Sequence, residues 1–243
     1  MKAYENLRAV LVIGLFLAFF QIQAAQSTGV DPSLEAWWSF DQVQENKIPD
    51  LSGHNRIARP AQEWDLSKAQ VSGKVGKALE FPGNRYLIVP GYRGITGMKA
   101  RTIVAWIRTT KNRGTIVRWG KNDFGRMWSF GYIRGRIGVS PRGGYFYMKE
   151  PTHDGKWHMV AITLKEGNPP RFEDFATLYL DGEVAEIHDI GLLDLWPINT
   201  GTDMEVRIGE RFQGAIDELR IYSRALSADE IQQLWKEAQK TKK

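Results

Sequence analysis

The 243-residue sequence contains no cysteine, so disulfide bonds and thiol chemistry are both excluded. A chain without disulfides must be stabilised by its own hydrophobic core. Aromatic residues make up 12% of the sequence, and a chain of this length buries most of its surface on folding. The sequence therefore has the material for a large core that needs no covalent cross-links.

Long apolar runs are scarce as well, and the clearest one spans residues 9–20, after Lys2 and Arg8. It is about a dozen residues long, short of the ~20 that cross a bilayer as a helix. Small residues follow at Ala24 and Ala25, the layout of a secretory signal peptide cleaved after Ala25. We therefore expect residues 1–25 to direct export to the periplasm, the cell surface or the medium. An uncleaved membrane anchor is the alternative.

Strong charge of one sign is also missing, because the formal net charge is only +5. Basic residues are mixed with acidic ones along the chain, whereas nucleic-acid-binding proteins concentrate basic side chains on one face. We therefore expect no nucleic-acid partner. A basic cluster at residues 108–142 could meet anionic sugars or an acidic cell surface, or it could be a solvated strand face.

Long helical periodicity is absent between residues 34 and 222. Short β-type runs separated by Gly, Pro, Asn and Asp occur instead, which predicts two packed antiparallel sheets or a barrel. The clearest predicted strands span residues 34–40, 78–81, 86–89, 101–108, 114–119, 128–133, 136–139, 156–164, 176–180, 206–208 and 214–222.

Local signals mark one turn and one helix near the end of the chain. Asp181-Gly182 supplies the positive φ angles of a tight hairpin, and long loops are expected at residues 165–174 and 187–205. Ser227 and Glu230 form a capping box ahead of an amphipathic segment. We expect a short helix that lays Trp235 against the edge of the sandwich and a basic tail that frays.

Four segments, taken in order, resemble the laminin G-like domains of the concanavalin A-like lectin and glucanase superfamily. They read AWWSFD (36–41) with DLSG (50–53), GKALEFPG (76–83), DGKWH (154–158) and GAIDELRIYSRALS (214–227). The resemblance implies an all-β, two-sheet antiparallel jelly-roll sandwich with a short C-terminal helix. The expected layout is a signal peptide at 1–25, a linker at 26–33, the sandwich at 34–236 and the tail at 237–243.

The catalytic strand of hydrolases with this fold is missing. Such enzymes carry Glu-x-Asp-x-x-Glu, because a retaining mechanism needs two carboxylates about 5 to 5.5 Å apart. The nearest match, at residues 63–68, ends in Lys68, and the spacing of Glu183, Glu186 and Asp189 mixes both faces of a strand. We therefore expect a binding module and not an enzyme. A divergent glycoside hydrolase is the alternative.

A structural calcium ion is implied by the resemblance. In similar sandwiches such an ion joins the start of the domain to the last strand, and Asp217 occupies the matching position. Calcium binds several oxygens, including backbone carbonyls. The other ligands would come from Phe40 or Asp41 and from the region of Gly83. In the alternative, Asp217 accepts hydrogen bonds from backbone amides.

A ligand surface is predicted in the middle of the chain. Sugars bind to aromatic rings combined with planar hydrogen-bonding groups, and residues 119–147 supply both. The expected partner is a glycan or cell-surface polysaccharide, and a protein-binding adhesive role is the alternative. Each aromatic here could equally belong to the core. The candidates are Trp119, Asn122, Asp123, Trp128, Tyr132, Arg134, Arg142, Tyr145 and Tyr147.

Overall fold

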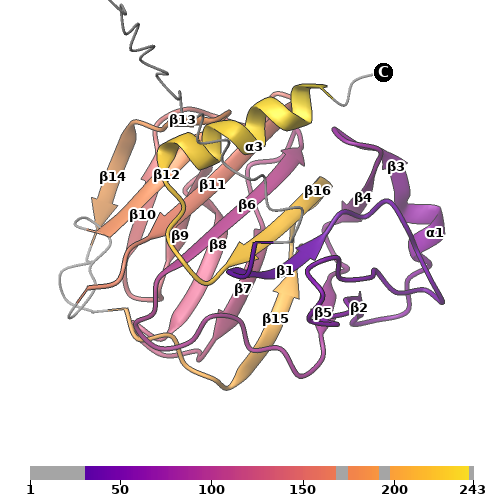
Figure 1. Cartoon of the computed structure of the whole chain (residues 1–243), viewed down its shortest axis with the longest axis horizontal. Helices are drawn as coiled ribbons and strands as arrows, with labels where there is room; N and C mark the ends of the chain where they lie inside the picture. The colour runs from indigo at the N-terminus through magenta and orange to yellow at the C-terminus, as the bar shows by residue number, and fades with distance from the viewer. Residues whose placement is uncertain (1–30, 168–174, 192–197, 241–243) are drawn as a thin grey trace, which may run out of the picture.

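The structure is a computed structural model that describes residues 31–167, 175–191 and 198–240. The predicted signal peptide lies outside these residues, as does most of the loop expected at 165–174. Two eight-stranded sheets pack face to face, and every strand pair is antiparallel (Figure 1). The predicted jelly-roll sandwich is confirmed.

One sheet, here called the helix-covered sheet, has the order β13-β12-β11-β6-β16-β4-β3, and β1 also pairs with β16. Its strands are β1 (Leu34–Trp38), β3 (Gln70–Ser72), β4 (Lys77–Pro82), β6 (Arg101–Arg108), β11 (Trp157–Leu164), β12 (Ala176–Leu180), β13 (Glu183–Val184) and β16 (Gln213–Tyr222).

The second sheet, here called the open sheet, has the order β14-β10-β9-β8-β7-β15-β5-β2. Its strands are β2 (Arg59–Pro60), β5 (Leu87–Val89), β7 (Thr115–Gly120), β8 (Met127–Ile133), β9 (Arg136–Ser140), β10 (Tyr145–Met148), β14 (Ile187–Gly191) and β15 (Met204–Ile208).

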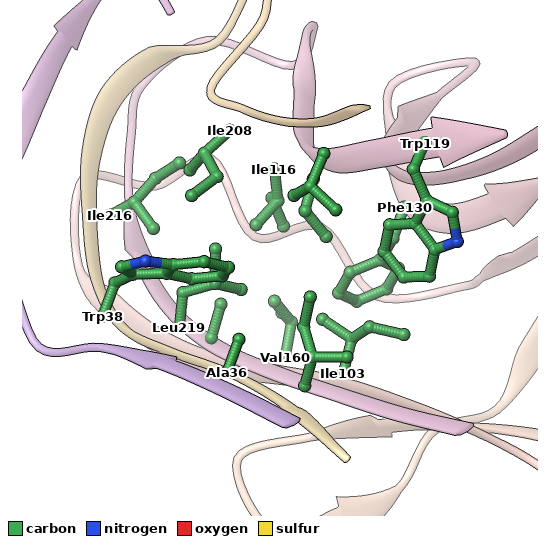
Figure 2. Packing of buried hydrophobic residues seen from close by; sticks show 14 of the residues in the cluster. Ala36, Trp38, Ile103, Ile116, Trp119, Phe130, Val160, Ile208, Ile216 and Leu219 are labelled. Carbon is green, nitrogen blue, oxygen red and sulfur yellow. The ribbon is translucent and has the colours of Figure 1, made fainter. Parts of the chain in front are cut away.

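The main core lies between the sheets, where alternate side chains of each strand meet. Figure 2 shows Ile103 and Val160 of the helix-covered sheet facing Ile116 and Phe130 of the open sheet, with Trp119 at one end. These side chains are fully buried. The sandwich therefore needs no disulfide, as the sequence predicts.

A second apolar cluster lies on the outer face of the helix-covered sheet. Helix α3 (Ala228–Lys240) runs across β12, β11 and β6 (Figure 1), and its Ile231 and Ala238 pack with Trp106 and Met159. The other described helix, α1 (Leu66–Ala69), contacts β4. Neither described helix covers the outer face of the open sheet.

The predicted capping box and hairpin are both confirmed. Ser227 N donates to Glu230 Oε2 at 2.8 Å, and Glu230 N donates to Ser227 Oγ at 3.2 Å. Asp181 and Gly182 have φ angles of 51° and 88° in the turn between β12 and β13. Trp235 packs on this turn, because a Cβ added at Gly182 would lie 3.0 Å from its side chain.

Two predicted boundaries are wrong. Helix α3 continues to Lys240 and buries Ala238, so a frayed tail does not begin at residue 237. The loop expected at 187–205 begins with β14, which pairs with β10 at the edge of the open sheet. Both were missed because polar residues at an edge strand or on the exposed side of a helix carry little hydrophobic pattern. No helix in the described residues is long and apolar enough to cross a membrane.

Candidate binding face

Trp119 and Trp128 lie in the core, which corrects their predicted role in ligand binding. The two residues pair across β7 and β8, and their rings stack with centroids 6.0 Å apart. Both side chains are fully buried, and Trp119 Nε1 donates to the carbonyl of Ile95 at 2.9 Å. A Cβ added at Gly94 would lie 2.4 Å from the Trp119 ring. A ligand cannot reach either indole without unpacking the sandwich.

Tyr132 also serves the packing of the sandwich. Its ring stacks on Phe212 with a centroid distance of 6.4 Å, and its hydroxyl donates to the Thr152 carbonyl at 3.1 Å. Burial raises the pKa of Tyr132 to about 12, so its hydroxyl stays protonated at neutral pH. Tyr132 therefore joins the end of β8 to the segment before β11.

Arg134, Tyr145 and Tyr147 lie together at one edge of the open sheet, around a residue that was not predicted as a ligand-binding candidate. Both tyrosine hydroxyls donate to Asp189 Oδ2 at 3.3 Å, and Arg134 Nη1 lies 3.6 Å from the same oxygen. The Arg134 Cζ is 4.4 Å from the Tyr145 ring centroid, and His188 lies against Tyr147. The carboxylate of Asp189 thus already satisfies these groups.

Asn122, Asp123 and Arg142 form a separate rim. Arg142 Nη1 donates to the Asn122 carbonyl, and Arg142 Cζ lies 5.6 Å from the ring of Phe124. Phe124 is 51% exposed. The Asp123 carboxylate accepts from the Phe124 amide at 2.9 Å and so shapes its own turn. The predicted candidates are thus divided among the core, a strand edge and this rim.

A cavity of about 640 Å³ opens beside β5, where β7 ends and β15 begins. It brings together side chains from segments far apart in the sequence, since Arg207 pairs with Ile88 on one side and with Arg118 on the other. Of the predicted candidates, it contains Asn122. The lining polar and aromatic residues are Tyr86, Arg93, Lys121, Asn122, Asp203, Glu205 and Arg207.

Contacts around this cavity hold its side chains in place. Arg207 Cζ lies 5.4 Å from the Tyr86 ring centroid, and Arg207 Nη1 donates to Glu210 Oε1 at 3.1 Å. Glu205 Oε1 accepts from the Gly91 amide at 2.9 Å, and Arg93 donates to the carbonyl of Thr202. The cavity is thus a set of positioned donors and acceptors beside one aromatic ring, the composition of a site for a polar organic ligand.

Sequence reasoning missed most of this cavity for a physical reason. Tyr86, Lys121 and Arg207 belong to three segments that meet only through the register of β15 with its two neighbours. The available signal is the alternation in β15, where Val206 and Ile208 are buried and Arg207 is not. Arg207 therefore had to lie on the outer face of a sheet.

The predicted calcium ligands are only partly brought together. Asp217 is fully buried, and its Oδ2 accepts from the amides of Lys74 and Val75 at 2.8 and 3.0 Å. Its Oδ1 is buried with no hydrogen-bond partner among the described residues. Asp41 contacts the same turn, since its Oδ1 accepts from the Lys77 amide at 2.8 Å. Two carboxylates and one orphaned oxygen therefore meet beside residues 73–77.

Burial of two carboxyl groups dominates the electrostatics at this turn. The pKa of Asp217 is raised to about 8, mainly by burial and also by the charges of Glu218 and Asp41, although the hydrogen bonds from two backbone amides lower it. Burial also raises the pKa of Glu218. A cation here would relieve both the burial and the repulsion of these carboxylates.

Of the other predicted calcium ligands, Gly83 is wrong, while the carbonyls of Phe40 and Asp41 already accept hydrogen bonds. The six residues of β4, which separate the turn from Gly83, span about 20 Å of strand, so Gly83 is too far from Asp217 to share an ion. The carbonyls of Phe40 and Asp41 accept from Gln70 Nε2 at 2.8 and 3.2 Å, which leaves a second lone pair on each oxygen. The described residues contain no group of three or more His, Cys, Asp or Glu side chains arranged to hold a metal.

Comparison with known families decides the relationship. A sequence model described as the concanavalin A-like lectin/glucanases superfamily matches residues 81–232, more than half of the chain. The chain belongs to this superfamily. The resemblance seen in the four sequence segments is thereby confirmed, and no curated relative matches the chain in sequence.

Solved structures with the same superfamily fold include binding domains of larger proteins. Domain 4 of AbnA, a GH43 extracellular arabinanase from Geobacillus stearothermophilus, was solved in complex with arabinotriose. It is 19% identical with a TM-score of 0.62, over 83% of this chain and 98% of that domain. At this identity the likeness shows the fold alone.

Two toxin domains are also similar. The ligand-binding domain of botulinum neurotoxin serotype D, in complex with N-acetylneuraminic acid, is 17% identical with a TM-score of 0.53, over 84% of this chain and 51% of that one. The binding domain of Paraclostridial Mosquitocidal Protein 1 is 15% identical with a TM-score of 0.52, over 84% and 51%. The matched part is thus about half of each of these two chains.

Proposed function

We propose that the protein is an exported, non-catalytic carbohydrate-binding module whose ligand lies on the outer face of the open sheet. The observation that carries the proposal is the cavity beside β5, β7 and β15, where Tyr86, Asn122 and Arg207 converge. An aromatic ring can cover the apolar side of a pyranose or furanose, while amide and guanidinium groups bind its hydroxyls.

Further observations support the proposal. Helix α3 occupies the outer face of the other sheet with an apolar cluster, so that face is already used for folding. Similar sandwiches were solved with arabinotriose and with N-acetylneuraminic acid bound. The apolar stretch at residues 9–20 supports export, which would bring the module to polysaccharides outside the cell.

A structural calcium ion is part of the proposal. Asp217 and Asp41 would supply carboxylate oxygens, and the carbonyls of Phe40 and Asp41 would complete the set together with backbone of the adjoining turn. The support is the buried, unpartnered Oδ1 of Asp217 beside two other carboxylates. When bound, the ion would hold β1 and the segment after it against β16, away from the sugar cavity.

The experiment is a screen of the purified protein against neutral and acidic polysaccharides, followed by affinity measurements on two cavity variants. Arg207→Ala and Asn122→Ala should each weaken binding about tenfold or more, since each removes a directed hydrogen-bonding group. The matched control is Arg113→Ala, an exposed arginine just before the opposite end of β7.

The outcomes separate the functional classes. Saturable binding that is lost in the cavity variants but kept in Arg113→Ala supports the proposal. Binding that both kinds of variant retain contradicts the assigned face, and release of sugar products during the screen contradicts the non-catalytic role. Failure to bind any polysaccharide contradicts the carbohydrate ligand.

A further inference from the structure

Trp64 separates two cavities that lie outside the site described above. It belongs to the segment between β2 and α1. One cavity, of about 570 Å³, is lined by Asn46, Arg59 and Gln62 among others, and the other, of about 540 Å³, by Asn84 and Arg85. The residues that line both are Glu63, Trp64 and Asp65. The indole therefore lies between two hollows of the surface.

The position of Trp64 is fixed by its neighbours. Its ring packs edge-on against Phe81 with 5.3 Å between centroids, and its carbonyl accepts from Asn46 Nδ2 at 3.0 Å. Asp65 then caps α1 by accepting from the Ser67 amide at 3.1 Å. Trp64 remains partly exposed. An aromatic ring held in this way loses little conformational entropy when a ligand stacks on it.

Unused hydrogen-bonding groups surround the indole. Gln62, Glu63, Asn84 and Arg85 make no side-chain hydrogen bond or ion pair within the described part of the chain. Gln62, Glu63 and Asn84 are exposed. These planar amide, carboxylate and guanidinium groups, set around one indole, have the composition that sugar sites require.

The Trp64 cavities share no lining residue with the cavity that contains Tyr86, but neighbouring residues of the same two segments line them. Ala61 lines the cavity that contains Tyr86, and its amide donates to the Tyr86 carbonyl at 3.0 Å. Its chain neighbours Pro60 and Gln62 line the 570 Å³ cavity at Trp64. Arg85, next to Tyr86, lines the 540 Å³ cavity. The three hollows therefore lie near the β2 edge of the open sheet, where successive residues alternate between its two sides, and Tyr86 and Trp64 are their aromatic residues.

We propose that Trp64 forms a second carbohydrate subsite and that the ligand is a chain of several sugar units. This inference rests on the proposed carbohydrate-binding function. One part of the chain occupies the cavity at Tyr86, and a later part stacks on Trp64 and bonds with Gln62, Asn84 and Arg85. The protein accordingly recognises the interior of a polysaccharide rather than a single terminal sugar.

The test compares affinity for short and long oligosaccharides of the polysaccharide identified in the screen. For the wild type, affinity should rise with length until the chain reaches Trp64. In Trp64→Ala the gain with length should be lost, about tenfold for the longest chain, while affinity for a disaccharide stays unchanged. Arg207→Ala is the matched comparison, because it should weaken both short and long ligands.

Because Trp64 also packs against Phe81, Trp64→Ala could destabilise the fold. The melting temperature of this variant is therefore measured, and a second variant is tested. Asn84→Ala combined with Arg85→Ala keeps the indole and should reduce the affinity of long chains alone. The inference is overturned if wild-type affinity is independent of length, or if both variants bind long chains as the wild type does. If no sugar binds to the wild type, the proposed function itself fails.

Discussion

The Arg101 guanidinium lies over the ring of Trp128, with 4.8 Å between Cζ and the ring centroid, and both side chains are fully buried. Among the described residues, no carboxylate pairs with Arg101. Instead it donates to the carbonyls of Ile95 and Gly97 and to Thr200 Oγ1 at 2.8 to 3.0 Å. These oxygens partly compensate its charge, and the hydrogen bonds connect β6 to two neighbouring loops.

This arrangement predicts a large stability loss in Arg101→Lys. Lysine has three donors on one nitrogen and cannot reproduce the planar set of contacts, so buried carbonyls lose their partners. We expect the free energy of unfolding to fall by about 3 kcal/mol or more, measured by urea denaturation. Arg142→Lys, at an exposed arginine, should change it by less than about 0.5 kcal/mol. Equal effects in the two variants would contradict the buried role.

The placement of the aromatic residues predicts opposite outcomes for two substitutions. Trp128→Ala should lower the free energy of unfolding by about 3 to 5 kcal/mol, because it leaves a cavity in the core. Tyr145→Ala, at the partly exposed edge cluster, should cost about 1 kcal/mol or less. Thermal and chemical denaturation of both variants measure these changes in the free energy of unfolding. A stable, folded Trp128→Ala protein that has lost only ligand binding would return Trp128 to the binding surface.

The contacts of His158 with two carboxylates predict that the stability of the fold depends on pH. Its Nδ1 lies 2.8 Å from Asp181 Oδ2 and its Nε2 lies 3.1 Å from Asp154 Oδ1, and the hydrogen bond to Asp181 is the main factor that raises its pKa. The protonated ring is therefore favoured in the folded state. Its stabilisation is fully present below about pH 6.5, the pKa of histidine in the unfolded chain, and is lost as pH rises through the higher folded value.

The measurement is the difference in unfolding free energy between the wild type and His158→Gln from pH 5 to pH 9. Taking the difference removes the contribution of other titrating groups. We expect the wild type to be more stable at the acidic end by up to about 1 kcal/mol, the range of partly exposed ion pairs. A difference that is constant with pH, or that grows as pH rises, would exclude a charged His158.

Calcium should stabilise the fold through Asp217. Addition of the ion should raise the melting temperature. At a calcium concentration a hundredfold above Kd, the free energy of unfolding should rise by about 2.7 kcal/mol. EDTA should reverse the rise, and Asp217→Asn should abolish it, whereas Asp123→Asn in the exposed loop should preserve it. An EDTA-treated wild type whose melting temperature does not respond to calcium would disprove the site.

The strands were predictable from sequence wherever one side chain in two enters the core. The strand expected at residues 101–108 is β6 itself, and the capping box at Ser227 located the start of α3. Strand β10 was missed because its Tyr-Phe-Tyr-Met run is short and follows Gly144. Strand β14 was missed because, among the described strands, it pairs only with β10, and because it carries polar residues.

The candidate site was much less predictable. An aromatic residue in a strand points either into the core or outward, and nothing local distinguished Trp128 from Tyr145. Arginine side chains mostly lie on exposed surfaces, yet Arg101 is fully buried with backbone carbonyls as partners. The cavity itself depends on strand register between distant segments, which a single sequence does not encode in any local pattern.

The most direct test of the central claim is an NMR titration of the isotope-labelled protein with the polysaccharide identified by screening. The account predicts backbone amide shifts concentrated around residues 85–93, 120–123 and 203–207, together with the Trp64 indole signal, and little change in α3. Shifts confined to α3 and the outer face of the helix-covered sheet, or to the Tyr145 edge, would contradict it.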